Sequence, residues 1–166
     1  MKQINTEILK SLNPCADRYA VWLKHYKKFD GSLVDFLELD KITAQDKIWV
    51  AIHVMPRFLI EVFAIDCAFS AYAADAAAAT NTAYVSNAYA AAATTYAAVA
   101  AAYATTYAAA SDADATYAIH YALSAANSAS SAAFNADAYY ATANANAERE
   151  TQIDALIMLL ESEGES

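Results

Sequence analysis

Apolar residues recur at helical spacing through the first 66 positions of the chain. Between Pro14 and Tyr26, four of them fall at i, i+3, i+4 and i+7, which places them on one side of a helix. They are Tyr19, Trp22, Leu23 and Tyr26. Two further segments have the same pattern, one with Leu33, Phe36 and Leu37 and the other with Ile48, Ala51, Ile52 and Met55. This part of the chain is therefore predicted to form several short amphipathic helices.

Polar residues mark where these helices begin and end. Asn13 can cap a helix that has Pro14 at its first position, and Ser32 starts the next helix after a turn at Asp30-Gly31. Thr43 with Asp46 three residues later resembles a capping box. Pro56 ends that helix, and a new one begins at Arg57.

The helix that begins at Arg57 is apolar on two sides. One stripe contains Phe58, Val62, Ile65, Phe69 and Tyr72, and a second contains Leu59, Phe63 and Cys67. A helix that is apolar all round is usually buried. We therefore expect this helix to be central, with Phe63 and Phe69 buried together with Trp22.

Residues 67–147 are dominated by Ala and place Tyr at regular positions. On a helical wheel, four Tyr residues fall within about 40° of each other: Tyr89, Tyr96, Tyr103 and Tyr107. Val85 and Val99 flank them, while Asn87, Thr94 and Thr105 fall on the opposite side. This pattern predicts that the Tyr and Val side faces inward, and the four Tyr residues are also the candidate interaction stripe.

A single helix over residues 67–147 would be about 120 Å long and could not bury its own apolar side. We therefore expect the chain to fold back at 79–82, 111–114 and 128–131, where Thr, Asn, Ser and Asp gather. A last amphipathic helix is predicted from Glu150 to Glu161, with Ile153, Leu156, Ile157 and Leu160 on its apolar side.

Composition supports an all-α fold, because the 166 residues include only two Gly and two Pro while Ala, the strongest helix former, dominates. The prediction is one helical domain over residues 1–166, a bundle of seven or eight helices. In it, short helices from 1–66 pack with long, antiparallel Ala/Tyr-rich helices from 67–147, and 148–166 adds an acidic helix and tail.

Charge narrows the classes of partner. The formal net charge is −9, and no Lys or Arg lies between Arg57 and Arg149, so this half has nothing with which to neutralise phosphates. Nucleic-acid binding is not expected. Residues 76–111 carry no charge, but they lack Leu, Ile and Phe and have no flanking basic cluster, so no membrane span is expected either.

The two cysteines, Cys15 and Cys67, are too few for a disulfide framework and are expected to be small buried hydrophobes. With no secretory signal at the N-terminus, a reducing, cytoplasmic setting is predicted.

No motif in the sequence indicates catalysis. Asp66-Cys67 lies in a helix without a positioned base, and the three histidines, His25, His53 and His120, are scattered without metal-ligand spacing. Two glycines, Gly31 and Gly164, cannot form a phosphate-binding loop. The protein is therefore predicted not to be an enzyme and to need no cofactor or metal.

The chain resembles a group of Ala/Tyr-rich immunity proteins of bacteria and related uncharacterised phage proteins. The resemblance is carried by NPCADRYAVWLKHY (13–26), DKIWVAI (46–52) and FAIDCAFSAYAADAAAA (63–79), with the Ala/Tyr-rich residues beyond. It implies a small cytoplasmic helical protein that binds and neutralises another protein, such as a toxin or a host defence factor. No site residue is transferred with it.

Three hypotheses follow. The first is a stoichiometric inhibitor of another protein, of the immunity or phage counter-defence type. The second is a structural protein that forms homo-oligomers through its Ala/Tyr faces. The third is a binder that sequesters a small ligand in a Tyr-lined cavity between helices.

Overall fold

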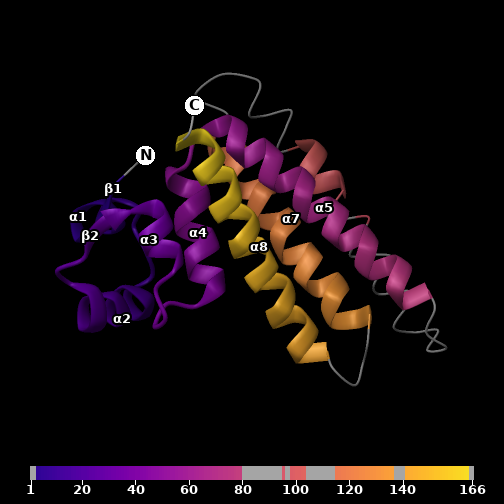
Figure 1. Cartoon of the computed structure of the whole chain (residues 1–166), viewed down its shortest axis with the longest axis horizontal. Coiled ribbons are helices and arrows are strands. Elements are labelled where there is room, and N and C mark those ends of the chain that lie inside the picture. The colour runs from indigo at the N-terminus through magenta and orange to yellow at the C-terminus, as the bar shows by residue number, and fades with distance from the viewer. Residues whose placement is uncertain (1–2, 80–94, 96–97, 104–114, 137–140, 165–166) are drawn as a thin grey trace.

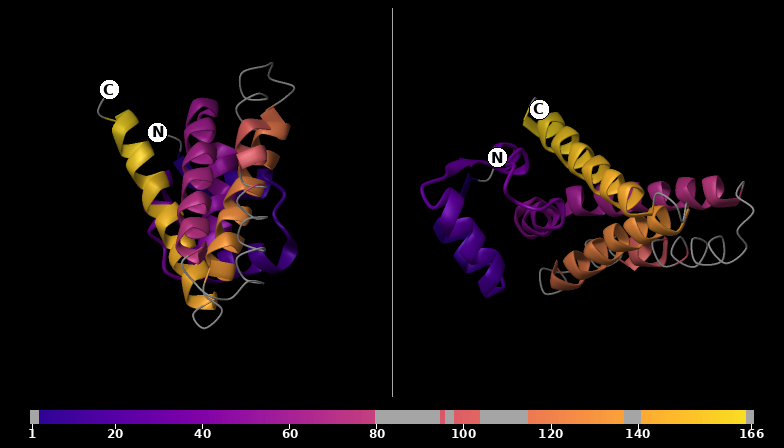
Figure 2. Two further views of the ribbon diagram at one scale, coloured as in Figure 1. Left: turned by 90° about the vertical axis from the view of Figure 1, so that its right-hand side faces the viewer. Right: turned by 90° about the horizontal axis from the view of Figure 1, so that it is seen from below.

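The computed structural model describes residues 3–79, 95, 98–103, 115–136 and 141–164 of the chain. Its N-terminal section consists of short elements in the order β1 (Gln3–Asn5), α1 (Thr6–Ser11), α2 (Ala16–Tyr26), β2 (Asp30–Ser32), α3 (Leu33–Leu37) and α4 (Ala44–Val54). Three long helices follow, α5 (Arg57–Ala79), α7 (Ala115–Ala136) and α8 (Ala141–Gly164). The short elements gather at one end of the long helices, and α4 contacts both α7 and α8 (Figures 1 and 2).

Helix starts in the N-terminal section follow the predicted caps at two of three places. Ser32 and Asp35 form a capping box at the start of α3, and the Thr43 hydroxyl accepts a hydrogen bond from the Asp46 amide at the start of α4. The start of α2 differs from the prediction, because the helix begins at Ala16. Asn13 instead has a positive φ of 54° just after α1, a conformation that Asn tolerates at a helix end.

A two-stranded antiparallel sheet replaces the turn predicted at Asp30-Gly31. Ile4 of β1 lies opposite Gly31 of β2, and the Ile4 side chain is fully buried. A Cβ on Gly31 would lie 2.8 Å from a ring carbon of Phe29, so this position favours glycine. The strands are three residues each and lack β-branched runs, so local pattern did not reveal them.

The three long helices pack lengthwise, with α8 running back alongside α7 (Figure 1). Small side chains on α7 face its neighbours and are fully or almost fully buried: Ala122, Ala125, Ala126 and Ala129. Because Ala adds so little volume, the helix axes can approach closely. The structure thus confirms an all-α multi-helix bundle, and α8 extends well beyond the predicted Glu150–Glu161 helix.

The break predicted at residues 128–131 is wrong, because α7 is continuous through them. The Ser130 hydroxyl donates to the Ala126 carbonyl at 3.2 Å, and the Ser131 hydroxyl donates to the Asn127 carbonyl at 3.0 Å. The hydroxyls of these serines form hydrogen bonds to the preceding turn of the same helix and do not cap a new helix. Most of the break predicted at 79–82 lies outside the described residues, which stop at Ala79 and resume at residue 95. The one at 111–114 lies outside the described residues.

One cluster of buried residues joins the short elements to the long helices. Trp22 and Phe63 are buried as predicted, and the Trp22 indole donates to the Thr6 hydroxyl at 3.1 Å. The largest fully buried side chains of this cluster are Phe36, Phe63, Ile4, Leu33, Leu37, Ile48, Ile52, Leu156 and Cys67. The prediction that Phe69 is buried is wrong, since 69% of its surface is exposed.

Candidate interaction site

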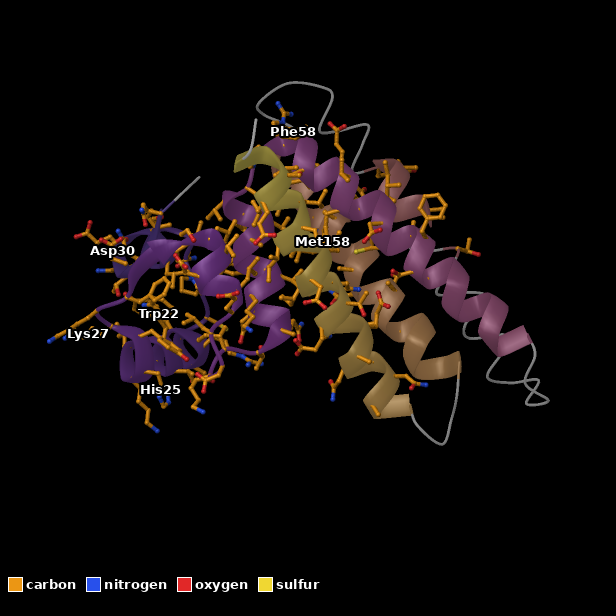
Figure 3. All side chains as sticks on the ribbon, in the orientation of Figure 1. Trp22, His25, Lys27, Asp30, Phe58 and Met158 are labelled. Atoms are coloured by element: carbon orange, nitrogen blue, oxygen red, sulfur yellow. The ribbon has the colours of Figure 1, made fainter. Side chains whose placement is uncertain are left out.

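Helix α5 exposes a line of large apolar side chains on the side away from the core. They are Phe58, Val62, Ile65 and Phe69, each between 43% and 69% exposed, and we refer to them as the α5 stripe. Their spacing of four, three and four residues keeps them within about 60° on the helix. Figure 3 shows Phe58 near the start of α5, at the edge of the bundle.

The exposure of the α5 stripe corrects the prediction of a fully buried helix. The opposite side of α5, with Leu59, Phe63 and Cys67, is buried, and α5 makes its most extensive contact with α7. Among the described residues, α7 and α8 are the helices that pack against α5, and the buried side faces them. Apolar exposure that forms one contiguous line is typical of a binding surface, whereas scattered single residues are not.

Acidic residues lie on both sides of the α5 stripe. Glu61 and Asp66 fall about 40° beyond its two edges on the helical wheel. Asp66 is exposed and Glu61 is partly exposed. Arg57 precedes the stripe at the start of α5, and the two side chains that flank the stripe along its length are both acidic.

A further exposed apolar residue, Met158, lies on the neighbouring helix α8 and is 70% exposed. Met158 lies in the half of α8 that ends beside the start of α5, the end that carries Phe58 (Figure 3). Met is a flexible side chain that adapts to different partners. Apolar exposure at this end of the bundle therefore comes from two helices.

The predicted Tyr stripe can be compared with the structure at one position only. Tyr89, Tyr96 and Tyr107 lie outside the described residues. Tyr103 is 47% exposed, and its ring stacks on that of Tyr121 of α7, with centroids 4.9 Å apart.

The inward orientation predicted for this segment is wrong where the structure describes it. Ala100 and Ala101 are buried, whereas Val99 is about half exposed, as Tyr103 is. The two small residues belong to the buried core cluster, whereas the two larger ones are about half exposed.

A polar cluster lies where α5, α7 and α8 meet. The Gln152 amide donates to the Ala126 carbonyl at 3.1 Å and to the Glu148 carboxylate at 2.9 Å. Burial raises the pKa of Glu148, and the nearby charge of Asp66 raises it further. Arg149 donates to the Asn127 side chain at 3.1 Å, so this cluster ties α8 to α7.

The buried cysteine, Cys67, is not an activated thiol. Burial raises the pKa of Cys67 well above its ordinary value, and the charges of Glu148 and Asp66 add to this rise. A thiol in this state is a poor nucleophile. Cys67 is a buried hydrophobe as predicted, whereas Cys15 is exposed, which corrects the expectation for that residue.

An apolar pocket of about 240 Å³ lies between α2 and α4. The Arg18 guanidinium at its rim donates to the Asp46 carboxylate at 3.0 Å. The pocket is lined by Leu9, Pro14, Arg18, Tyr19, Val21, Trp22, Phe36, Lys41, Ile42, Thr43, Asp46, Trp49 and Val50. The pocket is large enough for a small apolar molecule, but it has one Tyr and lies outside the Ala/Tyr-rich segment.

Within the described ranges, no three His, Cys, Asp or Glu side chains gather in a way that could hold a metal ion. In the same ranges, no helix is long and apolar enough to span a membrane. The chain matches no protein-family model, no curated protein and no solved structure.

Proposed function

We propose that this protein acts without catalysis, by binding another protein stoichiometrically and blocking it, as an inhibitor of the immunity or phage counter-defence type. The observation that supports this proposal most is the α5 stripe. Four large apolar side chains in contact with water do not stabilise the fold. Covering them with a partner removes apolar surface from water and therefore stabilises the complex.

The chemistry of the described residues is consistent with binding rather than turnover. The buried thiol has a raised pKa, and the exposed carboxylates of α5 border apolar side chains. A rim of charge around an apolar centre is the usual anatomy of a protein interface.

The experiment is co-expression of this chain with the product of a neighbouring gene, a toxin or a defence factor. We expect a complex with a fixed 1:1 or 2:2 stoichiometry by light scattering, and loss of the partner's activity in proportion to the inhibitor added. Inhibition at far less than one equivalent would indicate catalysis and would contradict the proposal.

The pocket between α2 and α4 supports a second candidate, sequestration of a small apolar ligand. The probe is 8-anilinonaphthalene sulfonate, which becomes fluorescent in apolar sites. Ile42→Trp, which fills the pocket, should abolish the signal, and the double variant Phe58→Ser/Phe69→Ser should leave it unchanged. The reverse result would assign the dye to the α5 stripe and count against this candidate.

A further inference from the structure

The α5 stripe has the geometry of a helix-packing seam. Its spacing of four, three and four residues matches the alternation by which one helix packs against another. It spans about three helical turns, or about 16 Å from Phe58 to Phe69. A straight line of this kind, with a large ring at each end, fits an amphipathic helix better than a loop or a sheet edge.

The acidic residues beside the α5 stripe determine which charge a partner helix must carry. In a helix pair, the residues beside the apolar seam face the corresponding residues of the partner. Glu61 and Asp66 hold these places on α5, and the whole chain carries a net charge of −9. A partner with Lys or Arg beside its seam is attracted, and one with acids there is repelled.

If two copies of the chain paired through their α5 stripes, their acidic residues would repel each other. The stripe is nearly symmetric about the midpoint between Phe63 and Ala64, so a two-fold antiparallel pair would match Phe58 with Phe69 and Val62 with Ile65. The same two-fold axis brings the two Asp66 carboxylates to one side and the two Glu61 carboxylates to the other. Apolar matching alone would favour a homodimer, but the charges oppose it at neutral pH.

The Ala/Tyr-rich part of the chain lacks the complementary charge as well. Residues 67–147 contain no Lys or Arg, so no segment there can pair with the acidic border. We therefore propose that the α5 stripe binds an amphipathic helix of a different protein, with an apolar seam bordered by Lys or Arg. This inference rests on the proposed function, because it names the surface and the partner chemistry of the inhibitor.

The test uses two synthetic helical peptides with the same Leu seam, one bordered by Lys and the other by Glu. Fluorescence anisotropy with the full chain should show 1:1 binding of the Lys peptide and much weaker binding of the Glu peptide. Phe58→Ser/Phe69→Ser should weaken binding of the Lys peptide by roughly tenfold or more, because buried aromatic residues dominate interface energies.

Two control variants separate the stripe from general effects. Leu23→Ser removes an exposed apolar side chain from α2 without changing charge, and should leave the affinity unchanged. Glu61→Gln/Asp66→Asn should weaken binding of the Lys peptide several-fold more than Asp17→Asn/Glu38→Gln. The second pair removes the same charge at exposed positions in the N-terminal section.

Three results would overturn the inference: equal affinities for the two peptides, equal effects of the stripe and α2 variants, or a dimer at neutral pH that the stripe variant dissociates. The test does not depend on the inhibitor role. Peptide binding at the stripe without inhibition of any partner would refute the proposed function alone. If the complex with a natural partner tolerates Phe58→Ser/Phe69→Ser, the α5 stripe is not the binding surface, and the proposed inhibitor function still stands.

Discussion

Phe63 and Phe69 are the same residue type on the same helix, six positions apart, yet one is fully buried and the other is 69% exposed. Six residues correspond to a rotation of about 240°, so the two rings point to different sides of α5. The sequence identified both apolar lines of this helix but predicted both to be buried, and only the line with Phe63 is. It did not reveal which stripe the other helices cover, because that depends on where α7 packs.

The two rings should therefore differ in their contribution to stability. Phe63→Ala should lower the free energy of unfolding by about 3–5 kcal/mol, because it leaves a cavity in the core. Phe69→Ala should change it by about 0.5 kcal/mol or less, as surface substitutions usually do. Urea denaturation followed by circular dichroism measures both, and a large loss from Phe69→Ala would show that this ring is packed.

Glu148 makes stability depend on pH in a stated direction. Its pKa in the folded protein is raised above its ordinary value of 4.5. As pH rises, the folded state therefore loses this proton at a higher pH than the unfolded state does. The carboxyl group therefore contributes stability below about pH 4.5, and this contribution is lost as pH rises through the folded pKa.

Glu148→Gln removes this titration while keeping an acceptor for the Gln152 amide. The free energy of unfolding of the variant, relative to the wild type, should rise between pH 4 and pH 7. Glu150→Gln, exposed on the same helix, is the matched control for the change of charge. A difference that stays constant or falls with pH would contradict the role of burial at Glu148.

At the scale of elements, two of the three predicted caps were right, whereas packing partners could not be predicted. Ser32 and Thr43 could be recognised because a cap is a local hydrogen bond within four residues. The serines at 130 and 131 misled the prediction, since the same hydroxyls can bond the preceding turn of a continuous helix. Likewise, the sheet between β1 and β2 joins residues almost thirty positions apart and had no local signal.

The Ala-rich side of α7 should tolerate no added volume. Ala125→Leu introduces a larger side chain at a fully buried position and should cost about 1–3 kcal/mol through overpacking. Ala143→Leu, at an exposed position of α8, is the control and should be close to neutral. Thermal denaturation of the two variants compares them directly, and similar midpoints would mean that α7 does not pack through its small side chains.

For the whole molecule, composition was the most informative property. Abundant Ala and rare Gly and Pro predicted an all-α bundle, and the structure confirms it. The candidate site was only partly predictable. The residues of the α5 stripe were recognised as one apolar line, but they were assigned to the core. The interaction stripe predicted on Tyr89, Tyr96, Tyr103 and Tyr107 stays a prediction, because three of these residues lie outside the described residues. An apolar line reads the same in sequence whether another helix of the chain or another protein covers it.

We propose that one side of α5 packs in the core and that the other side binds a partner. The most direct measurement compares the thermal midpoints of Ala64→Glu and Ile65→Glu. These neighbours differ by about 100° around the helix, and each variant adds one negative charge. Ala64 is fully buried and Ile65 belongs to the α5 stripe. We expect Ala64→Glu to lower the midpoint sharply or prevent folding, and Ile65→Glu to keep the wild-type midpoint while losing the Lys peptide. A comparable fall in the midpoint of Ile65→Glu would contradict the claim, because it would show that the protein itself covers the α5 stripe.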